Sequence, residues 1–252
     1  MRTLLWKEIL EQWRSQRLLI VAAVLAAFGL LGPLSARYMP ELLGSMPGVP
    51  EGLAEILPTP DAAMAVGEYL DNVVQFGVVL ALLVPMGAVA GEKASGTAAL
   101  TLSKPVSRAA FLAAKLAAHA ITFAIGVLAA ALAGYYYTGV LFTWLPAADF
   151  AALNLLVWLY LMVWVSITLM TSTLGRSQLA AAGGAFGILL VLGVLGGWPP
   201  LAPWLPGALI GWARALGMGV PVDPAWRAVA LTAAVAAGAQ LIAWASLRRQ
   251  EL

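Results

Sequence analysis

The feature that most constrains this chain is a set of six long apolar runs that are almost free of charged residues. They are Leu18–Leu34, Val73–Ala90, Ala109–Tyr137, Ala151–Leu174, Leu179–Trp198 and Ala228–Leu247. A helix of roughly 20 mostly apolar residues can cross the ~30 Å hydrocarbon core of a bilayer. A charge at mid-bilayer costs about 2.5–3.5 kcal/mol on insertion scales, so the near-absence of charge is informative. The runs predict an all-α integral membrane protein with six transmembrane helices.

The composition excludes several other classes of protein. Only 10% of the 252 residues are charged and 62% are hydrophobic, whereas soluble domains carry roughly 25% charged residues. The chain has no cysteine and one histidine, which excludes a disulfide framework and a Cys/His zinc cluster. We therefore expect no catalytic residue, cofactor-binding residue or metal site in this chain, and nothing in it points to nucleic acid.

The basic residues predict the orientation in the membrane. With the N-terminus inside, 11 of the 14 Lys and Arg residues fall on the inner side. These are Arg2, Lys7, Arg14, Arg17, Lys93, Lys104, Arg108, Lys115, Arg176, Arg248 and Arg249. Lys115 is the only charged residue within the runs, near the start of the third, from where its stem could extend back to the headgroups. The positive-inside rule thus predicts a multi-pass protein with both termini in the cytoplasm, consistent with a bacterial plasma or inner membrane.

The segment before the first run has two interpretations. A basic flank followed by an apolar run is also typical of a signal peptide. The flank is long, however, and contains Glu8 and Glu11, which favours a retained span. Residues 2–17 place Leu4, Ile9 and Trp13 at helical spacing, which predicts an amphipathic helix lying flat at the inner interface. A plain cytoplasmic lead-in remains the alternative.

The expected outer connections differ in character. Residues 35–72 are acidic and proline-rich, which predicts a small irregular cap. Residues 199–227 are broken by proline but have an apolar middle, including Trp204, Leu209 and Trp212. A re-entrant or interfacial helical hairpin fits this composition, provided that protein shelters its backbone.

The inner connection, residues 91–108, carries the most specific pattern. Gly96 interrupts the helix leaving the second span, and Thr97 is a plausible N-cap for a short helix over 98–102. Pro105 stops that helix, and Ser107 can cap the next span. The pattern predicts a two-turn helix across the cytoplasmic mouth that could dock into another protein, although a plain connecting loop is equally compatible with the residues.

This connection resembles that of the permease subunits of ABC-2 type ATP-binding-cassette transporters. The matching residues are Glu92, Gly96, Thr97, Leu102, Ser103, Lys104, Pro105, Val106, Ser107, Arg108 and Lys115. The opening Trp6-Lys7-Glu8, followed by Trp13-Arg14, also resembles that family's N-terminal interface helix. The span count and the apolar outer connection before the last span agree as well.

The resemblance implies that residues 91–108 contain a coupling helix that docks in a cleft of a separate ATPase subunit. The residues expected to serve this contact are Glu92, Gly96, Thr97, Leu100, Leu102, Lys104, Pro105 and Arg108. It also implies two permease copies, or two related permeases, with an export route between them. The sequence contains no G-x-x-x-x-G-K-[ST] phosphate loop, so ATP and magnesium are expected in the partner.

The spans give weaker indications about cargo and packing. None holds an Asp, Glu or Arg, which argues against ion-coupled transport and leaves an amphipathic or lipid-like cargo. The fifth span carries the small-xxx-small pairs Gly183/Gly187 and Gly193/Gly197, which predict close helix packing, including packing between two copies. His119 has no acidic or cysteine neighbours in its run, so an interfacial position is expected for it. The rival function is a non-transporting scaffold or assembly factor that anchors a cytoplasmic partner.

Overall fold

The computed structural model describes residues 2–45 and 59–250, and within these ranges the only regular elements are helices. They are α1 (Arg2–Arg14), α2 (Arg17–Ser45), α4 (Ala62–Leu83), α5 (Ala90–Ala94), α6 (Thr97–Leu102), α7 (Arg108–Leu141), α8 (Ala147–Leu174), α9 (Gln178–Gly196), the 3₁₀ turn η1 (Ala202–Trp204), α10 (Gly207–Gly217) and α11 (Trp226–Arg249). Among the described helices, six are long and apolar enough to cross a membrane: α2, α4, α7, α8, α9 and α11. The predicted all-α membrane fold with six spans is confirmed.

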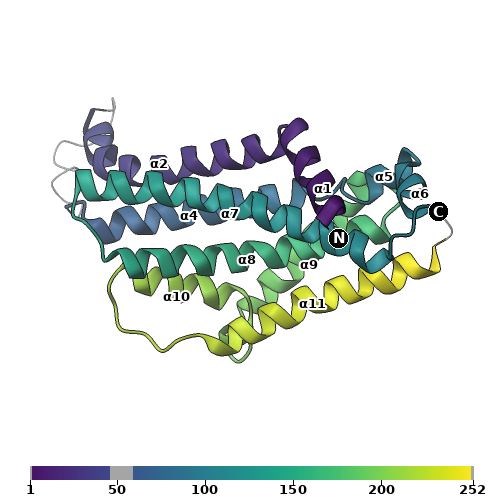
Figure 1. The fold of residues 1–252 in the computed structure, drawn as a ribbon. Helices are drawn as coiled ribbons and strands as arrows, with labels where there is room; N and C mark the ends of the chain where they lie inside the picture. Colours follow the sequence, from purple (N-terminus) through teal and green to yellow (C-terminus); the bar gives the residue numbers. More distant parts are fainter. Residues whose placement is uncertain (1, 46–58, 251–252) are drawn as a thin grey trace.

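The spans form an elongated bundle with α8 at its centre (Figure 1). Helices α2, α4 and α7 pack together on one side of α8, while α9, α10 and α11 pack on it from the other. In the most apolar stretch of α8, 67% of the residues are buried, whereas in the corresponding stretch of α9 only 11% are buried. Helix α9 therefore offers most of its surface to the surroundings.

The N-terminus, α5, α6 and the end of α11 all lie at one end of the bundle, which we call the basal end (Figure 1). The opposite end, where α7 passes into α8, is called the distal end. The short helix α1 turns away from the axis of α2 and packs against α7. The predicted amphipathic helix at residues 2–17 is thus a separate helix that ends at Arg14.

The first connection is shorter than the predicted cap at 35–72. Helix α2 runs on to Ser45 through Pro33 and Pro40, and α4 already begins at Ala62. The Asp61 carboxylate caps α4 by accepting a 2.7 Å hydrogen bond from the Met64 amide. Both helices extend past the apolar runs because a helix can continue beyond the hydrocarbon with one face still packed. The rest of the predicted cap, residues 46–58, lies outside the described residues.

The second span also ends earlier than the predicted Val73–Ala90, because α4 stops at Leu83. Pro85 lacks the backbone N–H that would continue the helical hydrogen bonds. The Ser172 hydroxyl of α8 compensates: it accepts bonds from the amides of Val89 (3.1 Å) and Ala90 (3.0 Å) and donates to the Met86 carbonyl (2.7 Å). The chain turns at the proline and restarts as α5.

The remaining spans begin and end within a few residues of the predicted runs. The outer connection at 199–227, predicted as a helical hairpin, contains the short turn η1 and the single helix α10, followed by a non-helical segment. Helix α10 packs on α8 and α4. An ion pair between Arg214 and Asp71 also links it to α4.

Candidate partner-coupling site

The connection between α4 and α7 folds into two short helices separated by Gly96. This glycine has φ +74°, a left-handed conformation that favours glycine, and it occupies the N-cap position of α6. Thr97 was predicted as the N-cap but is instead the first residue of α6, with its hydroxyl donating to the Glu92 carbonyl over 3.3 Å. Ser107 caps α7 as predicted, accepting a 3.1 Å bond from the Ala110 amide.

Helix α6 has an exposed face and an anchored face. Leu100 is 69% exposed, and Gly96, Thr97, Lys104 and Pro105 are exposed beside it. Leu102 points the other way and packs on a small apolar cluster that includes Phe111 of α7 and Leu247 of α11. Of the residues predicted to contact a partner, these exposed ones are free to do so, while Leu102 anchors the helix.

Glu92 and Arg108 are engaged within the chain. The Arg108 guanidinium donates to the carbonyls of Leu247 (2.6 Å) and Gln250 (3.2 Å), at the C-terminal end of α11. In α5, the Lys93 ammonium donates to the carbonyls of Thr173 (2.7 Å) and Gly175 (2.9 Å), at the end of α8. A cation at a helix C-terminus satisfies free carbonyls and complements the helix dipole. Burial lowers the pKa of Lys93.

Glu92 lies in a charge cluster that joins α5 to α1 and α7. Its Oε1 accepts from the Lys115 ammonium at 2.9 Å and from the Lys7 ammonium at 2.8 Å. Lys115 also donates to both carboxylate oxygens of Glu8, at 3.2 and 3.1 Å. The Lys115 residue is 1% exposed and Glu8 4%. We refer to Lys7, Glu8, Glu92 and Lys115 as the basal ion cluster.

The charges of the basal ion cluster stabilise each other. Burial alone would raise the pKa of the Glu92 carboxyl, but the charge and hydrogen bonds of Lys115 and Lys7 outweigh it and hold that pKa below its usual value. Partial burial alone would lower the pKa of Lys7, but its contacts with Glu92 and Glu8 raise it above the usual value. Both groups are therefore charged at neutral pH.

Three carboxylates in and beside the basal ion cluster lie close together, with lysine ammonium groups between them. Oxygens of Glu8, Glu11 and Glu92 lie within 4.8 Å of one another, a spacing that could hold a cation. The cation that these acids surround is an ammonium: Lys115 bonds to Glu8 and Glu92, and Lys7 lies 3.5 Å from Glu11. A divalent ion would have to displace those side chains.

A second polar pair extends the contact between α1 and α7. His119 Nδ1 lies 2.8 Å from the Lys115 carbonyl, and its Nε2 lies 3.1 Å from Gln12 Nε2. A carbonyl can only accept, so Nδ1 carries the proton and Nε2 accepts from the Gln12 amide, which leaves the imidazole neutral. His119, which was expected at the interface, is only 1% exposed and packs inside the chain.

Sequence reasoning missed Glu8, Gln12 and the buried role of Lys115, yet a signal was present. Glu8 and Gln12 are four residues apart, as are Lys115 and His119. Residues with this spacing share one helix face. When two helices each carry a polar pair at this spacing on an otherwise apolar face, the pattern favours packing of the two faces against each other, with the polar pairs in contact.

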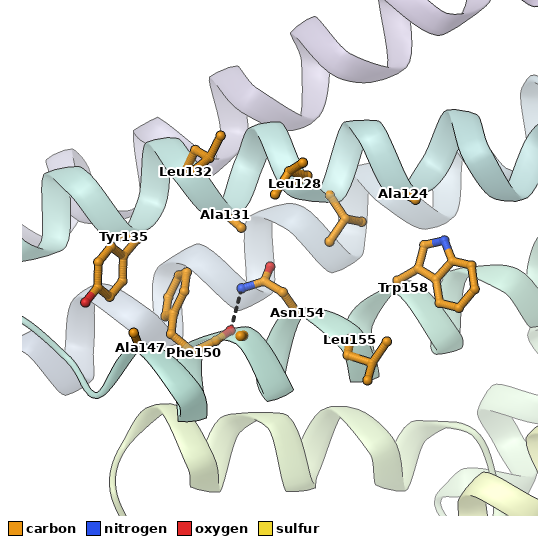
Figure 2. Close-up of a pocket in the computed structure, with 12 residues that line it drawn as sticks. Ala124, Leu128, Ala131, Leu132, Tyr135, Ala147, Phe150, Asn154, Leu155 and Trp158 are labelled. Carbon is orange, nitrogen blue, oxygen red and sulfur yellow. Dashed lines mark hydrogen bonds between the residues drawn. The ribbon is translucent and has the colours of Figure 1, made fainter.

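An apolar groove lies between α7 and α8 (Figure 2). It has a volume of about 510 Å³ and is lined mainly by alanine, leucine and aromatic side chains, with Tyr135 and Phe150 toward one end and Trp158 at the other. Its polar groups bond within the chain: Asn154 donates to the Phe150 carbonyl (2.8 Å) and Trp158 to the Ala120 carbonyl (3.1 Å). The groove therefore presents an apolar wall.

The glycines predicted to pack in the fifth span lie mostly in open surroundings. Among the described residues, a Cβ built on Gly183, Gly187 or Gly193 meets nothing within 4 Å, and one on Gly197 meets only the Val194 carbonyl of its own turn. Close packing inside the chain occurs at other glycines: Gly32 of α2 faces the Tyr69 backbone, and Gly126 of α7 faces Val21. The fifth-span glycines remain available to a neighbour outside this chain.

Comparison with known proteins identifies the family. A model of the ABC-2 family transporter proteins matches residues 2–205. The chain belongs to the ABC-2 family of transporter proteins. The match extends from α1 to η1, so it includes the basal ion cluster and α6. An uncharacterized transmembrane protein, YxlG from Bacillus subtilis (strain 168), is 30% identical over 207 residues, which cover 82% of this chain and 80% of that protein.

Membership in the ABC-2 family makes this chain a membrane component of a transporter. Members of the family generally associate with an ATPase subunit. At the basal end of this ABC-2 chain, a hollow adjoins the exposed face of α6. The hollow, of about 760 Å³, lies between α1 and α6 and is lined in part by Lys7, Thr97, Leu100 and Lys104.

Proposed function

We propose that this chain is the permease subunit of an exporter driven by a separate ATPase, which docks on α6 at the basal end. The observation that carries the proposal is the construction of α6. Its apolar tip, Leu100, is exposed, while the adjoining segment is held to α8 by Lys93 and to α11 by Arg108. A helix that is exposed at its tip and firmly held at its base is suited to receive a force from a partner.

We also propose where ATP binds and on which side of the membrane the basal end lies. ATP and magnesium belong to the partner subunit, in the cytoplasm, and the basal end with both termini faces that compartment. The excess of Lys and Arg at this end supports that orientation in a bacterial plasma or inner membrane.

We also propose that two permeases assemble through α9. This span is the least buried of the described spans, and its glycines Gly183, Gly187 and Gly193 leave room for the close approach of another helix. The cargo moves between the two copies and is amphipathic or lipid-like, in keeping with predicted spans that hold no Asp, Glu or Arg. Helix α10 then lies in the outer leaflet, sheltered by α8 and α4.

Co-purification with an ATP-hydrolysing subunit tests the proposal. A tagged wild-type chain should retain such a subunit, and Leu100→Ser should lose it at least tenfold while folding normally, because exposed substitutions usually change stability by no more than about 0.5 kcal/mol. Arg176→Ser, also exposed at the basal end but outside α6, serves as the matched control. Wild-type chain that purifies from the membrane without any ATPase would contradict the proposal.

A non-transporting scaffold is the second candidate; it would use the same exposed tip, but membership in the ABC-2 transporter family favours the permease. The two candidates differ in energetics. A permease should change the ATP hydrolysis rate of its bound subunit when cargo is present, whereas a scaffold should only hold the subunit at the membrane.

A further inference from the structure

The geometry points to Lys115 as the positioning residue that fastens the coupling segment, α5 and α6, to the third span α7 and, through α1, to the first span α2. The inference rests on the proposed function, because the displacement that it transmits is one imposed on α6 by an ATPase partner.

Each N–H donor of the Lys115 ammonium has an acceptor. An ammonium has three N–H donors, and Lys115 has three acceptors: two oxygens of Glu8 and one of Glu92. Glu8 belongs to α1 and Glu92 to α5, so one side chain of α7 holds two other elements. Lys7 closes the triangle, since it joins α1 to Glu92 over 2.8 Å.

Backbone packing does not supply the same connection. Helix α5 packs mainly on α6, α8 and α9, and α1 packs on α7 and α2. Among the described elements, α5 has no comparable backbone packing with α1 or α7. The carboxylate of Glu92 therefore supplies a polar link from α5 to both, beside the apolar contact of Leu102 in α6 with the cluster that contains Phe111 of α7.

Helix α1 in turn passes motion to the first span. The two helices are separated by Ser15 and Gln16, and Gln16 has φ 60°, a conformation that few residues other than glycine adopt. Such a conformation persists where the surroundings fix it. Here Ile20 donates to the Gln16 carbonyl over 2.8 Å, and Arg17 lies 3.8 Å from Glu11 across the bend. A shift of α1 is thus carried into α2.

The charge balance indicates why the basal ion cluster holds α1, α5 and α7 together. The two lysines and two glutamates sum to zero, so the cluster is stable in a buried position only while its members stay together. Separation of α5 from α7 would remove the Glu92 carboxylate from Lys115 and leave this buried ammonium with Glu8 alone. The coupling segment, α1 and α7 are therefore expected to move as one body.

A neutral double variant separates this role from simple stability. Lys115→Met/Glu92→Gln removes one charge of each sign and cuts the link between α7 and α5 without changing the net charge of the cluster. Glu11→Gln is the matched control, because it removes a half-exposed acid of the same surroundings and leaves the link intact. Lys115→Arg tests rescue by a cation of similar length.

The experiment measures three quantities for the complex in lipid nanodiscs: the unfolding temperature, the amount of co-purified ATPase, and the stimulation of ATP hydrolysis over the isolated ATPase subunit. For the double variant we expect bound ATPase in normal amount but stimulation reduced at least fivefold, a low value for coupling between sites. Glu11→Gln and Lys115→Arg should keep most of the stimulation. A folded, ATPase-bound double variant with normal stimulation would overturn the inference.

A measurement without the partner covers the remaining outcomes. The natural chain has no cysteine, so spin labels can be placed at Ala94→Cys on α5 and Thr3→Cys on α1, both exposed. The distance distribution should be narrow in the parent and broad in the double variant, or in Glu92→Gln alone if the double variant does not fold. Distance distributions of equal width in the parent and the variant would refute the link between α5 and α1 through the basal ion cluster. Failure of the wild-type chain to bind any ATPase would refute the proposed function and not this link.

Discussion

Lys115 carries its charge two turns into α7, after the apolar residues that follow Arg108, and its environment decides what that charge does. A lysine near the end of a span can extend to the headgroups, but here α1 covers the side chain and supplies Glu8. Removal of one member of a buried ion pair leaves the other unpaired, which is costly.

We predict that Lys115→Met lowers the free energy of unfolding by about 3–5 kcal/mol. Lys115→Met/Glu8→Gln should recover most of this loss, because it restores neutrality. Thermal or denaturant unfolding in detergent, followed by circular dichroism, measures both variants. Equal losses for the single and double variants would show that packing, not charge, accounts for the effect.

The lowered pKa of Glu92 predicts how stability depends on pH. Because the folded-state pKa lies below the unfolded value, Glu92 contributes stability above about pH 4.3 and loses that contribution as the pH falls through the lowered pKa. Lys7, whose pKa is raised, contributes below about pH 10.4 and loses its contribution above that value. The wild type should therefore lose more stability than Glu92→Gln on acidification below about pH 4. If the unfolding temperatures of the wild type and of Glu92→Gln fall by the same amount on acidification, the lowered pKa of Glu92 would not account for the pH dependence.

At the scale of elements, the sequence predicted the number and type of the spans but not all of their ends. Hydropathy detects the hydrocarbon core, so it missed the parts of α2 and α4 that continue beyond it, where Glu68 and Asp71 accompany the buried Tyr69. Hydropathy also predicted a span that continues past Pro85, because the apolar character of proline gives no sign that its backbone N–H is missing. The break was foreseeable from the proline, but its repair by Ser172, from a span far along the chain, was not.

Ser172 therefore makes a testable contribution. Ser172→Ala should destabilise the protein by about 1–3 kcal/mol, because the amides of Val89 and Ala90 lose their acceptor in a buried position. Ser103→Ala, at an exposed serine that ends α6, should have little effect. Equal unfolding temperatures for Ser172→Ala and wild type would show that another group accepts these amides.

Glycine positions show the limit of sequence patterns more clearly. A small-xxx-small pair indicates that a helix can be approached closely, but it does not say by what. Gly32 lies against α4, where an added Cβ would come within 2.6 Å of the Tyr69 backbone. The pairs in the fifth span, which the pattern favoured, face open space within the described part of the chain.

Gly32→Ala should lower the free energy of unfolding by about 1–3 kcal/mol, since backbone atoms must move to admit the methyl group. Gly187→Ala should leave monomer stability within about 0.5 kcal/mol but weaken association of two copies, if α9 forms their contact. Unfolding measurements and cross-linking in membranes distinguish these effects. An unchanged dimer with Gly187→Trp would place the contact elsewhere.

At the scale of the whole molecule, the sequence predicted that most Lys and Arg residues lie on one side of the membrane, and the structure gathers α1, α5, α6 and the end of α11 at the basal end (Figure 1). The exposed α6 was anticipated from a two-turn pattern between a glycine and a proline. Its support was not, because the spaced polar pairs of α1 and α7 indicate a match between those two helices but do not include Glu92, which joins them from α5.

The absence of native cysteine allows the orientation to be tested directly. A single cysteine at Lys104, near α6, should react with an impermeant maleimide only after the cells are permeabilised. One at Thr143, between α7 and α8, should react in intact cells. The reverse pattern would place α6 on the side without ATP.

Docking of an ATPase on α6 can be tested by photo-cross-linking from position 100, with a benzophenone amino acid in place of Leu100, in native membranes. We expect a covalent product with an ATP-hydrolysing subunit that is absent when the same residue is placed at Thr143. Cross-links from position 100 to lipid alone, in membranes where that ATPase is present, would contradict it.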